Sequence, residues 1–348
     1  MNGHRGTPMR DPMREVEPLV SVIIPCRGER SYISRCLRAL LNGTVKEIEV
    51  IVVDGISEDG TYEIVAAIGR EDDRVRLLRN PARVTPVALN MGIQAARGRH
   101  LAILGAHSEP APDWIERNLQ ALGRNPEAAA VGGVLETVGD TLIGRVIATV
   151  LSSPFGVGNA RFRVGGNPGD CDTVVFGCYR RQVFDRYGYF NEQLTTNQDD
   201  DFNIRLLAGG LRLHFDPAIR CRYYSRSTWR KALNQFWRYG FYKVRVFRNN
   251  KRIGSWRQVV PAVWVTFLAF AWPVVAILPV LRGLVLSVVA LYLILGIAFA
   301  ARNGRQCVLG ALLFLPVAAS LHCAYGLGTL CGAVDSLVTT DRGTGKTR

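Results

Sequence analysis

The sequence lacks the cysteine spacing of zinc-binding domains and the leader of secreted proteins. Its eight cysteines are scattered and none forms a Cys-x-x-Cys pair, so we expect no zinc site and a reducing compartment. Residues 1–18 are polar, contain prolines and have no apolar signal-peptide core, so they predict a disordered tail. We therefore expect the soluble part of the chain to stay on the side where it is synthesised.

Acidic residues are few compared with basic ones. The chain has 29 Asp and Glu against 43 Lys and Arg, a net charge of +14. A protein with such a charge can bind nucleic acid, an anionic membrane or phosphorylated ligands. The basic residues concentrate in residues 226–258, which run directly into an uncharged stretch. This arrangement is typical of a basic segment that lies at the cytoplasmic surface of a membrane. We therefore expect a membrane partner and no nucleic acid.

Charged residues are absent from two runs, residues 259–281 and 283–301, each long enough to cross a membrane as a helix. A third uncharged run, residues 307–334, contains His322 and ends in the glycines Gly326, Gly328 and Gly332, so it either crosses fully or tilts, breaks or re-enters. We expect a membrane region over residues 259–335 with two to three transmembrane helices, and a polar tail over 336–348.

The positive-inside rule places the basic segment 226–258 and the loop with Arg302 and Arg305 in the cytoplasm, which a crossing by the first two runs satisfies. A full third crossing would send the basic tail (Arg342, Lys346 and Arg348) to the opposite side. The sequence leaves this conflict open.

The first 225 residues alternate between strand and helix patterns. Short β-branched runs at Leu19–Pro25 and Ile48–Val53, and a run at His100–Leu104, predict strands; residues 32–41, 62–68 and 86–96 predict helices. This alternation predicts an α/β fold with an open parallel sheet wrapped by helices, occupying residues 19–225. Ligands of such sheets bind at the carboxyl ends of the strands.

Polar side chains follow the first two strands. The first strand leads into Arg27 and Glu29, and the second into the segment DGISEDGT, which begins at Asp54. Carboxylates at these positions can bind the ribose or base of a nucleotide, although DGISEDGT alone also fits a turn and a helix N-cap. The Gly-x-Gly-x-x-Gly fingerprint is absent, which disfavours a nicotinamide cofactor.

Several motifs in order resemble one family, the inverting family 2 glycosyltransferases, and especially bacterial exopolysaccharide enzymes of the succinoglycan-biosynthesis type. The resemblance covers about residues 19–242, and its motifs are VSVIIPCRGE, VVDGISEDGT, ALNMGIQAARG, GCYRRQVFDRYGYFNE, NQDDDFNIRLLAGG and QFWRYG. It implies a GT-A fold, with a mixed, mostly parallel sheet sandwiched by helices, that binds a nucleotide-activated sugar.

The resemblance assigns a set of residues to the nucleotide-sugar donor: Pro25, Arg27, Glu29, Asp54, Ser57, Asp59 and Asn90. The first three would line the nucleotide end of the cleft. Asp54 corresponds to the carboxylate that holds the uracil or ribose, supported by the serine and aspartate that follow it. The asparagine would help to shape the donor pocket.

The chain departs from the family where an Asp-x-Asp motif normally binds a divalent cation. Gly105-Ala106-His107 stands there instead. A neutral His107 can bind a metal, but Mg²⁺ prefers oxygen ligands and Mn²⁺ tolerates nitrogen better. Alternatively, arginines neutralise the diphosphate without a metal, or Glu109 supplies the missing oxygen. A divalent cation, Mg²⁺ or Mn²⁺, is thus an expectation that rests on His107.

The segment NQDDDFNIRLLAGG matches the family motif that carries the general base. Asp199 takes the base position, Arg205 follows six residues later, and Gln198 replaces the usual glutamate. Asp200 is assigned to the acceptor, and crowding by its carboxylate would raise a neighbouring pKa toward the working range. The same residues also fit an acidic helix N-terminus.

The segment QFWRY resembles the family's Gln-x-x-Arg-Trp signature. It implies acceptor contacts from Gln235 and Trp237 and a catalytic Arg238 near the diphosphate. The alternative is an amphipathic interfacial helix whose aromatic residues lie at the lipid headgroups. Arg245, Arg248 and Lys251, further along, are assigned to lipid contact.

Together these patterns predict a multi-pass membrane glycosyltransferase with a cytoplasmic catalytic domain. We expect transfer from a nucleoside diphosphate sugar, with a UDP-sugar as the expected donor, to a lipid-linked or membrane-proximal glycan, in exopolysaccharide or cell-envelope synthesis. Polysaccharide-assembly proteins are further expected partners. The alternative is a catalytically silent membrane protein of the same fold that binds a nucleotide sugar or scaffolds an assembly.

Overall fold

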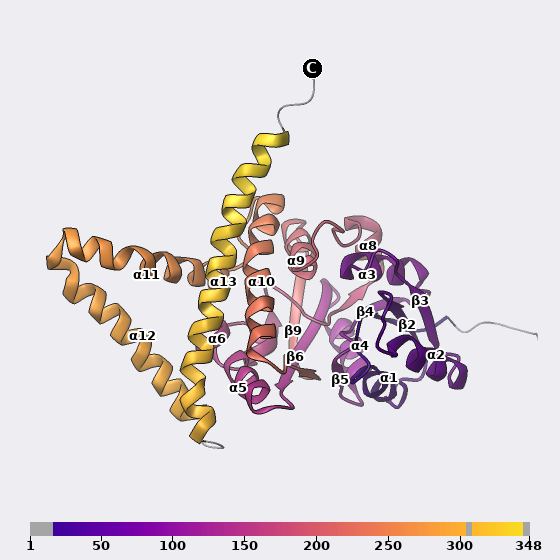
Figure 1. Ribbon diagram of the computed structural model, residues 1–348. Helices are drawn as coiled ribbons and strands as arrows, with labels where there is room; N and C mark the ends of the chain where they lie inside the picture. The colour runs from indigo at the N-terminus through magenta and orange to yellow at the C-terminus, as the bar shows by residue number, and fades with distance from the viewer. Residues whose placement is uncertain (1–16, 304–307, 344–348) are drawn as a thin grey trace, which may run out of the picture.

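The computed structural model describes residues 17–303 and 308–343. The expected tail over residues 1–18 and Arg305 therefore lie wholly or mostly outside the described residues. Figure 1 shows a domain built on a twisted sheet, followed by two helices, α10 and α13, that lie side by side, and a pair, α11 and α12, that extends away from them.

The sheet has nine strands in the order β3-β2-β1-β4-β8-β6-β9-β5, with β7 paired to β9. β1, β2, β3 and β4 are parallel to one another, and β8 joins antiparallel to β4. The strand bounds are β1 Val20–Cys26, β2 Ile48–Asp54, β3 Val75–Arg79, β4 His100–Ile103, β5 Ser108–Pro110, β6 Ala128–Val138, β7 Gly169–Asp170, β8 Cys178–Arg180 and β9 Arg212–Tyr224.

Helices cover both faces of this sheet. The first face buries residues of α1, α2 and α4, such as Leu37, Val65 and Trp114, in one hydrophobic cluster. The second face buries residues of α3, α8 and α9, such as Leu89 and Phe202, in another. The helix bounds in this domain are α1 Ile33–Leu41, α2 Thr61–Glu71, α3 Thr85–Ala95, α4 Trp114–Arg124, α5 Leu142–Leu151, α6 Pro154–Val157, α7 Arg161–Val164, α8 Gln182–Tyr187 and α9 Gln198–Ala208.

The structure confirms the expected mixed, mostly parallel sheet between helices. β1, β2 and β4, and α1, α2 and α3, lie where the sequence patterns predicted them. β1 reads as a continuous apolar run because it is buried on both faces: Val22 and Ile24 contact one cluster and Ile23 the other.

Within the described residues, three helices are long and apolar enough to cross a membrane, over residues 256–277, 279–302 and 308–338. They correspond to α11 Val260–Ile277, α12 Arg282–Asn303 and α13 Val308–Gly343, and α10 Trp229–Asn250 precedes them. α11 and α12 form a hairpin whose Trp264 and Tyr292 rings stack with centroids 4.4 Å apart. α13 continues to Gly343, so the segment expected to be a polar tail begins inside a helix.

The glycines of the third apolar run allow close helix packing, and α13 passes through them without a break. A Cβ on Gly328 would overlap the carbonyl oxygen of Trp237 in α10, and a Cβ on Gly332 would overlap that of Phe241. Gly240 of α10 approaches the backbone of Tyr325 in the same way. The two backbones are therefore close enough that only hydrogen fits between them.

Replacing Gly328 by valine should disrupt this contact. We expect about 1–3 kcal/mol of destabilisation or more, because the added methyl groups meet backbone that cannot move aside. The measurement is thermal unfolding of the detergent-solubilised protein. Gly283→Val is the matched control, since nothing lies within 4 Å of a Cβ there; equal melting temperatures for both variants would contradict the packing.

Part of the basic segment contacts protein where lipid contact was expected. Arg245 pairs with Asp335 of α13 at 3.0 Å, and Arg248 donates to the carbonyl oxygen of Ser336 at 3.1 Å. These two arginines therefore tie α10 to α13, which corrects their assignment to lipid alone.

Candidate active site

The carboxyl ends of β1 and β2 bring the predicted nucleotide-binding residues together. Cys26 pairs with Asp54 in register, and the carboxylate of Asp54 accepts hydrogen bonds from the backbone N–H and hydroxyl of Ser57. Ser57 Oγ in turn accepts the N–H of Gly28 at 3.0 Å. Asp54 is 1% exposed, so this carboxylate is held rigidly at the edge of the sheet.

Asp59 organises the adjoining loop. It accepts the backbone N–H groups of Arg30 and Thr61, each at 3.1 Å, and Thr61 Oγ1 accepts the N–H of Glu29 at 2.9 Å. Burial raises the pKa of Asp59, but the hydrogen bonds from the Thr61 hydroxyl and from the backbone N–H groups of Arg30 and Thr61 together lower it by more. Asp59 thus fixes the loop that carries Arg27 and Glu29, and Arg27 itself is exposed.

Pro25 occupies the penultimate position of β1, opposite Val53 of β2. It is half-buried and introduces no polar atom toward the loop. Its position sets where the strand ends and where the loop of Arg27 begins.

His107 lies beside Glu29, with Nδ1 and Oε1 3.1 Å apart, and its Nε2 is buried without a hydrogen-bond partner. Its ring contacts that of Tyr223 at 5.0 Å, and the Arg163 guanidinium lies 4.6 Å over the Tyr223 ring. Burial lowers the pKa of His107, but Tyr223 and Glu29 raise it by more. Glu109 is not part of this pair, because it accepts the hydroxyl of Tyr224 at 2.7 Å.

Tyr223 lies within a ring of positive charge. Burial raises its pKa, but His107, Arg163 and then Arg226 lower it by more, so its pKa falls below the ordinary value. Arg163 and Arg226 thus supply positive charge beside Tyr223, which suits an anionic ligand.

Two tyrosines, Tyr223 and Tyr239, connect this cluster to α9. Gln235 Nε2 donates to the Tyr239 hydroxyl at 2.6 Å. Burial raises the pKa of Tyr239, and the nearby Tyr223 and Asp199 raise it further. The QFWRY segment of α10 thus lies between the His107 cluster and Asp199.

α9 begins at the acidic motif, directly after a backbone turn at Asn197. Asn197 has a φ of 63°, a left-handed conformation that asparagine tolerates, and its Nδ2 donates to the carbonyl oxygen of Tyr239 at 2.8 Å. This contact ties the start of α9 to α10. The helix N-terminus favours carboxylates in its first turn, where Asp199 and Asp200 lie.

The surroundings of Asp199 raise its pKa. Burial, above all, and the neighbouring Asp200 carboxylate raise the pKa of Asp199 to about 6, while Lys243 lowers it. Lys243 of α10 is 2% exposed and pairs directly with Asp200, whose other oxygen accepts the Thr173 hydroxyl at 3.2 Å. A carboxylate with this pKa is mostly ionised near neutrality and still accepts a proton.

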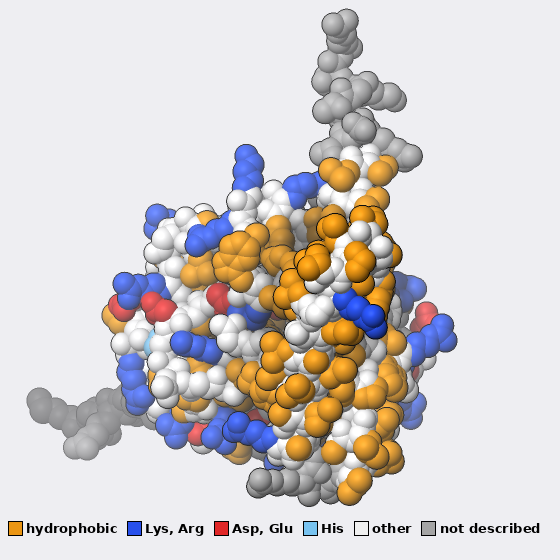
Figure 2. All heavy atoms as spheres, turned by 90° about the vertical axis from the view of Figure 1, so that its left-hand side faces the viewer, with side chains coloured by type: hydrophobic (Ala, Val, Ile, Leu, Met, Phe, Trp, Pro, Cys, Tyr) orange, Lys and Arg blue, Asp and Glu red, His pale blue; other side chains and the backbone are white. Residues whose placement is uncertain are grey.

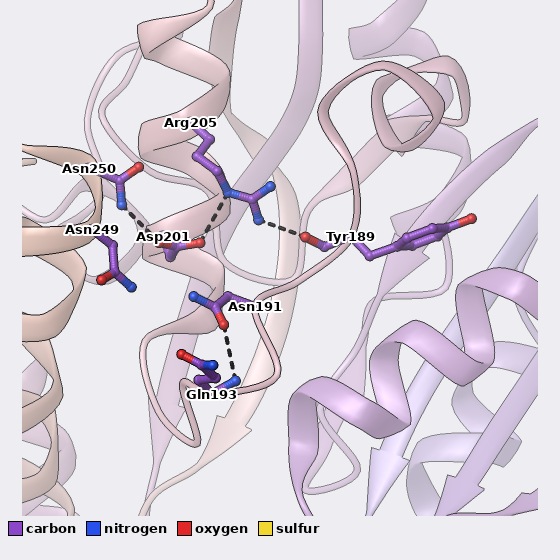
Figure 3. A pocket seen from close by; sticks show the side chains of 7 residues that line it. All are labelled: Tyr189, Asn191, Gln193, Asp201, Arg205, Asn249 and Asn250. Carbon is purple, nitrogen blue, oxygen red and sulfur yellow. Dashed lines mark hydrogen bonds and ion pairs between the residues drawn. The ribbon is translucent and has the colours of Figure 1, made fainter. Parts of the chain in front are cut away.

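The opposite side of α9 has a structural role. Asp201 accepts from Arg205 at 3.1 Å and from Asn250 at 2.8 Å, and Arg205 donates to the carbonyl oxygens of Tyr187 and Tyr189. Figure 3 shows the contacts of Asp201 with Arg205 and Asn250, and of Arg205 with Tyr189, beside a polar hollow of about 480 Å³, with the Tyr189 ring pointing away from it. Arg205 therefore holds the loop before α9.

Asn90 also acts on that loop. Its Nδ2 donates to the Phe190 carbonyl oxygen at 2.9 Å and to Glu192 at 2.8 Å, and its Oδ1 accepts the Phe190 N–H at 3.0 Å. These bonds use the whole amide. Its predicted contribution to the donor pocket is thus indirect, through the position of the loop.

Of the residues predicted for the acceptor, Gln235 and Trp237 lie on α10 and Asp200 lies on α9. Trp237 is 38% exposed and stacks on Phe241 with centroids 5.1 Å apart. Arg238 is exposed and reaches Thr195 Oγ1 at 3.4 Å, next to the start of α9. Gln235 and Asp200, by contrast, are already engaged by Tyr239 and Lys243.

The sequence interpretation missed Lys243 because it lies within the basic segment. The spacing of Lys243 could have indicated its place near the site. Gln235, Tyr239 and Lys243 follow one another at four-residue intervals, so they share one face of α10. Arg163 and Tyr223 carried no such signal, because the fold brings them to His107 from α7 and β9.

Comparison with known proteins decides the family. The pattern described as "Glycosyl transferase family 2" matches residues 21–188, and "Glycosyl transferase family group 2" matches residues 172–302. The chain belongs to glycosyl transferase family 2. It is a glycosyltransferase of EC class 2.4 with a GT-A fold, as the sequence resemblance predicted.

Two relatives of this family 2 glycosyltransferase have names that refer to glycan synthesis. The chain is 28% identical over 238 residues to a dolichyl N-acetyl-alpha-D-glucosaminyl phosphate 3-beta-D-2,3-diacetamido-2,3-dideoxy-beta-D-glucuronosyltransferase of Methanococcus voltae, covering 66% of this chain and 74% of the relative. It is 27% identical over 244 residues to the succinoglycan biosynthesis protein ExoA of Rhizobium meliloti, covering 69% and 73%.

The fold of this family 2 member can be compared with that of a solved structure. The mannosyltransferase PcManGT from Pyrobaculum calidifontis, in complex with GDP-Man and Mn²⁺, superposes with a TM-score of 0.55 and 19% identity. The superposition covers 93% of this chain and 88% of that one. It therefore extends from the sheet domain into the C-terminal helices.

Proposed function

We propose that this glycosyltransferase moves a sugar from a nucleoside diphosphate, with UDP as the expected nucleotide, to a lipid-linked or membrane-proximal glycan. The reaction inverts the anomeric configuration and serves exopolysaccharide or cell-envelope glycan synthesis. The observation that carries the proposal is the half-buried Asp199 carboxyl, with a pKa of about 6, at the start of α9. The two relatives named for glycan synthesis support the substrate class.

Transfer is a single displacement in which Asp199 accepts the proton of the acceptor hydroxyl. That oxygen forms a bond to the anomeric carbon while the bond from this carbon to the diphosphate oxygen breaks. The bonding electrons leave with the nucleoside diphosphate, and the proton remains on Asp199 until it returns to solvent. The Asp200–Lys243 pair keeps a second carboxylate beside the base neutralised.

The donor lies with its nucleotide at Asp54 and its diphosphate toward the cationic groups around Tyr223. Asp54 accepts hydroxyl or base N–H groups, for which a buried, fixed carboxylate is suited. Arg163 and Arg238 offer guanidinium groups that match phosphate oxygens. Trp237, exposed beside α13, provides a surface on which an acceptor sugar stacks.

A divalent cation is expected at His107. The buried Nε2 of His107 has no partner, and Glu29, beside Nδ1, would orient the imidazole so that Nε2 stays free for a cation. Among the described residues no three His, Cys, Asp or Glu side chains gather into a metal site, so the diphosphate and water would complete the coordination. When bound, the cation neutralises the charge that develops on the leaving diphosphate. The Mn²⁺ in the PcManGT structure supports this expectation.

Chelation should therefore stop transfer. We expect EDTA to reduce activity at least about tenfold, and Mn²⁺ to restore more of it than Mg²⁺, because an imidazole ligand suits Mn²⁺ better. Isothermal titration of Mn²⁺ in the presence of UDP, with His107→Ala as the comparison, tests the ligand directly. Full activity in EDTA would instead favour neutralisation by arginines alone.

We place the catalytic domain, residues 19–225, and the segment 226–258 in the cytoplasm. The basic residues of α10 and Arg302 support this side by the positive-inside rule. Nucleotide sugars are made in the cytoplasm, so the donor end of the site would open to its supply.

Transfer itself is tested with purified protein, radiolabelled UDP-sugars and a membrane lipid extract. The proposal predicts label in the lipid or glycan fraction. Donor binding without transfer under all these conditions would favour the silent scaffold, and assembly proteins would then be its partners.

A further inference from the structure

The first half of α13 packs against the catalytic domain. Phe314, Val317 and Leu321 are at most 1% exposed and form a cluster with α5 residues such as Val146. In the same stretch, Trp229 Nε1 of α10 donates to Ser320 Oγ at 2.8 Å. The inner face of α13 is therefore covered by parts of the protein that also hold the active site.

α10 runs parallel to α13 from this point on. Successive contacts join Trp229 to Ser320, Trp237 to Gly328 and Arg245 to Asp335. The seventeen residues from Ser320 to Ser336 span about 24 Å of helix, most of the thickness of a hydrocarbon core.

α10 is unsuited to hydrocarbon. Its sequence, with the residue that follows it, has no acidic residue and carries these basic ones: Arg230, Lys231, Arg238, Lys243, Arg245, Arg248 and Lys251. If α13 crossed the membrane, α10 would be drawn into the lipid beside it, with most of these charges uncompensated. Charged side chains in the bilayer core are costly and rare.

The outer face of α13 is apolar and exposed. Leu327, Leu330, Val334 and Leu337 follow at intervals of three or four residues and are 49%, 36%, 60% and 72% exposed. Figure 2 shows hydrophobic side chains gathered over the face that α11, α12 and α13 form, with Lys and Arg side chains around it. A helix with one protein-bound face and one apolar face fits the plane of a membrane interface.

We propose that α13 lies along the membrane surface, between the bilayer and the catalytic domain, and does not cross. The α11–α12 hairpin, which Figure 1 shows leaving α13 at a steep angle, supplies the crossings and places Arg282 at its far tip. Residues that follow α13 then stay on the side of the catalytic domain. This placement removes the conflict over the basic residues Arg342, Lys346 and Arg348.

The proposal rests on membrane association and not on the transfer reaction, so topology is measured separately from activity. A specific protease site is inserted before Pro18 in one variant and after Gly343 in another, and each variant is first shown to transfer sugar or bind donor. Protease is then added to sealed inside-out vesicles and to intact spheroplasts. Both sites should be cut in the same preparation, with a trapped marker protein left intact. Cleavage of the two sites in opposite preparations would overturn the proposal.

Lysine substitutions provide a second, independent measurement. Leu330→Lys on the outer face of α13 should leave the amount of membrane-bound protein within about twofold of wild type, because an interfacial lysine reaches the headgroups. Leu291→Lys, in the middle of α12 and 57% exposed, should reduce that amount by about fivefold or more. Equal losses for the two variants would show that α13 also crosses.

Discussion

Asp199→Asn is expected to lower kcat by about 10²–10⁴-fold, the usual contribution of a general base. The amide has almost the same shape as the carboxyl but does not accept the acceptor's proton. Donor affinity should change little, because the predicted donor contacts of Asp54 and Ser57 lie on other elements. The measurement combines steady-state transfer with isothermal titration of the nucleotide sugar.

A control separates loss of the base from a general change in surface charge. Asp185 of α8 is exposed, so Asp185→Asn should retain wild-type transfer. If Asp199→Asn retained more than about half of the wild-type kcat, the proton would have to go elsewhere and the proposed mechanism would be wrong.

Lys243→Met should damage both stability and the pH dependence of transfer. Lys243 is 2% exposed and pairs with Asp200. Its removal leaves a carboxylate without its cation, a change that costs about 3–5 kcal/mol for a buried pair. Because the positive charge of Lys243 lowers the pKa of Asp199, its loss should raise that pKa. The acidic limb of the rate profile then moves to higher pH, and activity at pH 7 falls.

The same substitution on an exposed part of α10 provides the control. Lys231 is exposed, and Lys231→Met should change neither the melting temperature nor the pH profile. A fall in stability with no shift of the acidic limb in Lys243→Met would assign Lys243 a purely structural role. Lys243→Arg should recover part of the wild-type profile, since it keeps the charge.

The sheet domain could be predicted from the sequence where local pattern and burial agree. β1 and β2 are continuous β-branched runs because both of their faces are buried, and the carboxylates after them lie at the sheet edge as expected. β6 and β9 were not predicted. They pair over a long register with irregularities near Gly132, and partner choice between distant strands depends on tertiary packing that no local pattern contains.

The residues of the candidate site could be predicted from the sequence where they belong to one continuous motif. Asp199 and its acidic neighbours are adjacent in sequence, but their different roles are not visible there. Asp200 faces Lys243, whereas Asp201 faces Arg205 and Asn250. The helical turn sends neighbouring carboxylates to different partners. The sequence shows a cluster of charge, and the structure shows that Asp200 and Asp201 have separate partners.

The sequence alone did not decide what the glycines of α13 do. Gly326, Gly328 and Gly332 were compatible with a break in the helix or with close packing. The structure favours packing because α10 and the start of α11 approach them directly. Only the presence of those neighbours distinguishes the two outcomes.

The most direct test of the proposed base is the pH dependence of kcat/KM for the wild-type enzyme between pH 5 and 8. A base must be deprotonated to act, so activity should be lost as the pH falls through the pKa of Asp199, about 6, and should reach a plateau above it. A profile that stays flat across this range, or one whose acidic limb persists unchanged in the residual activity of Asp199→Asn, would contradict the assignment.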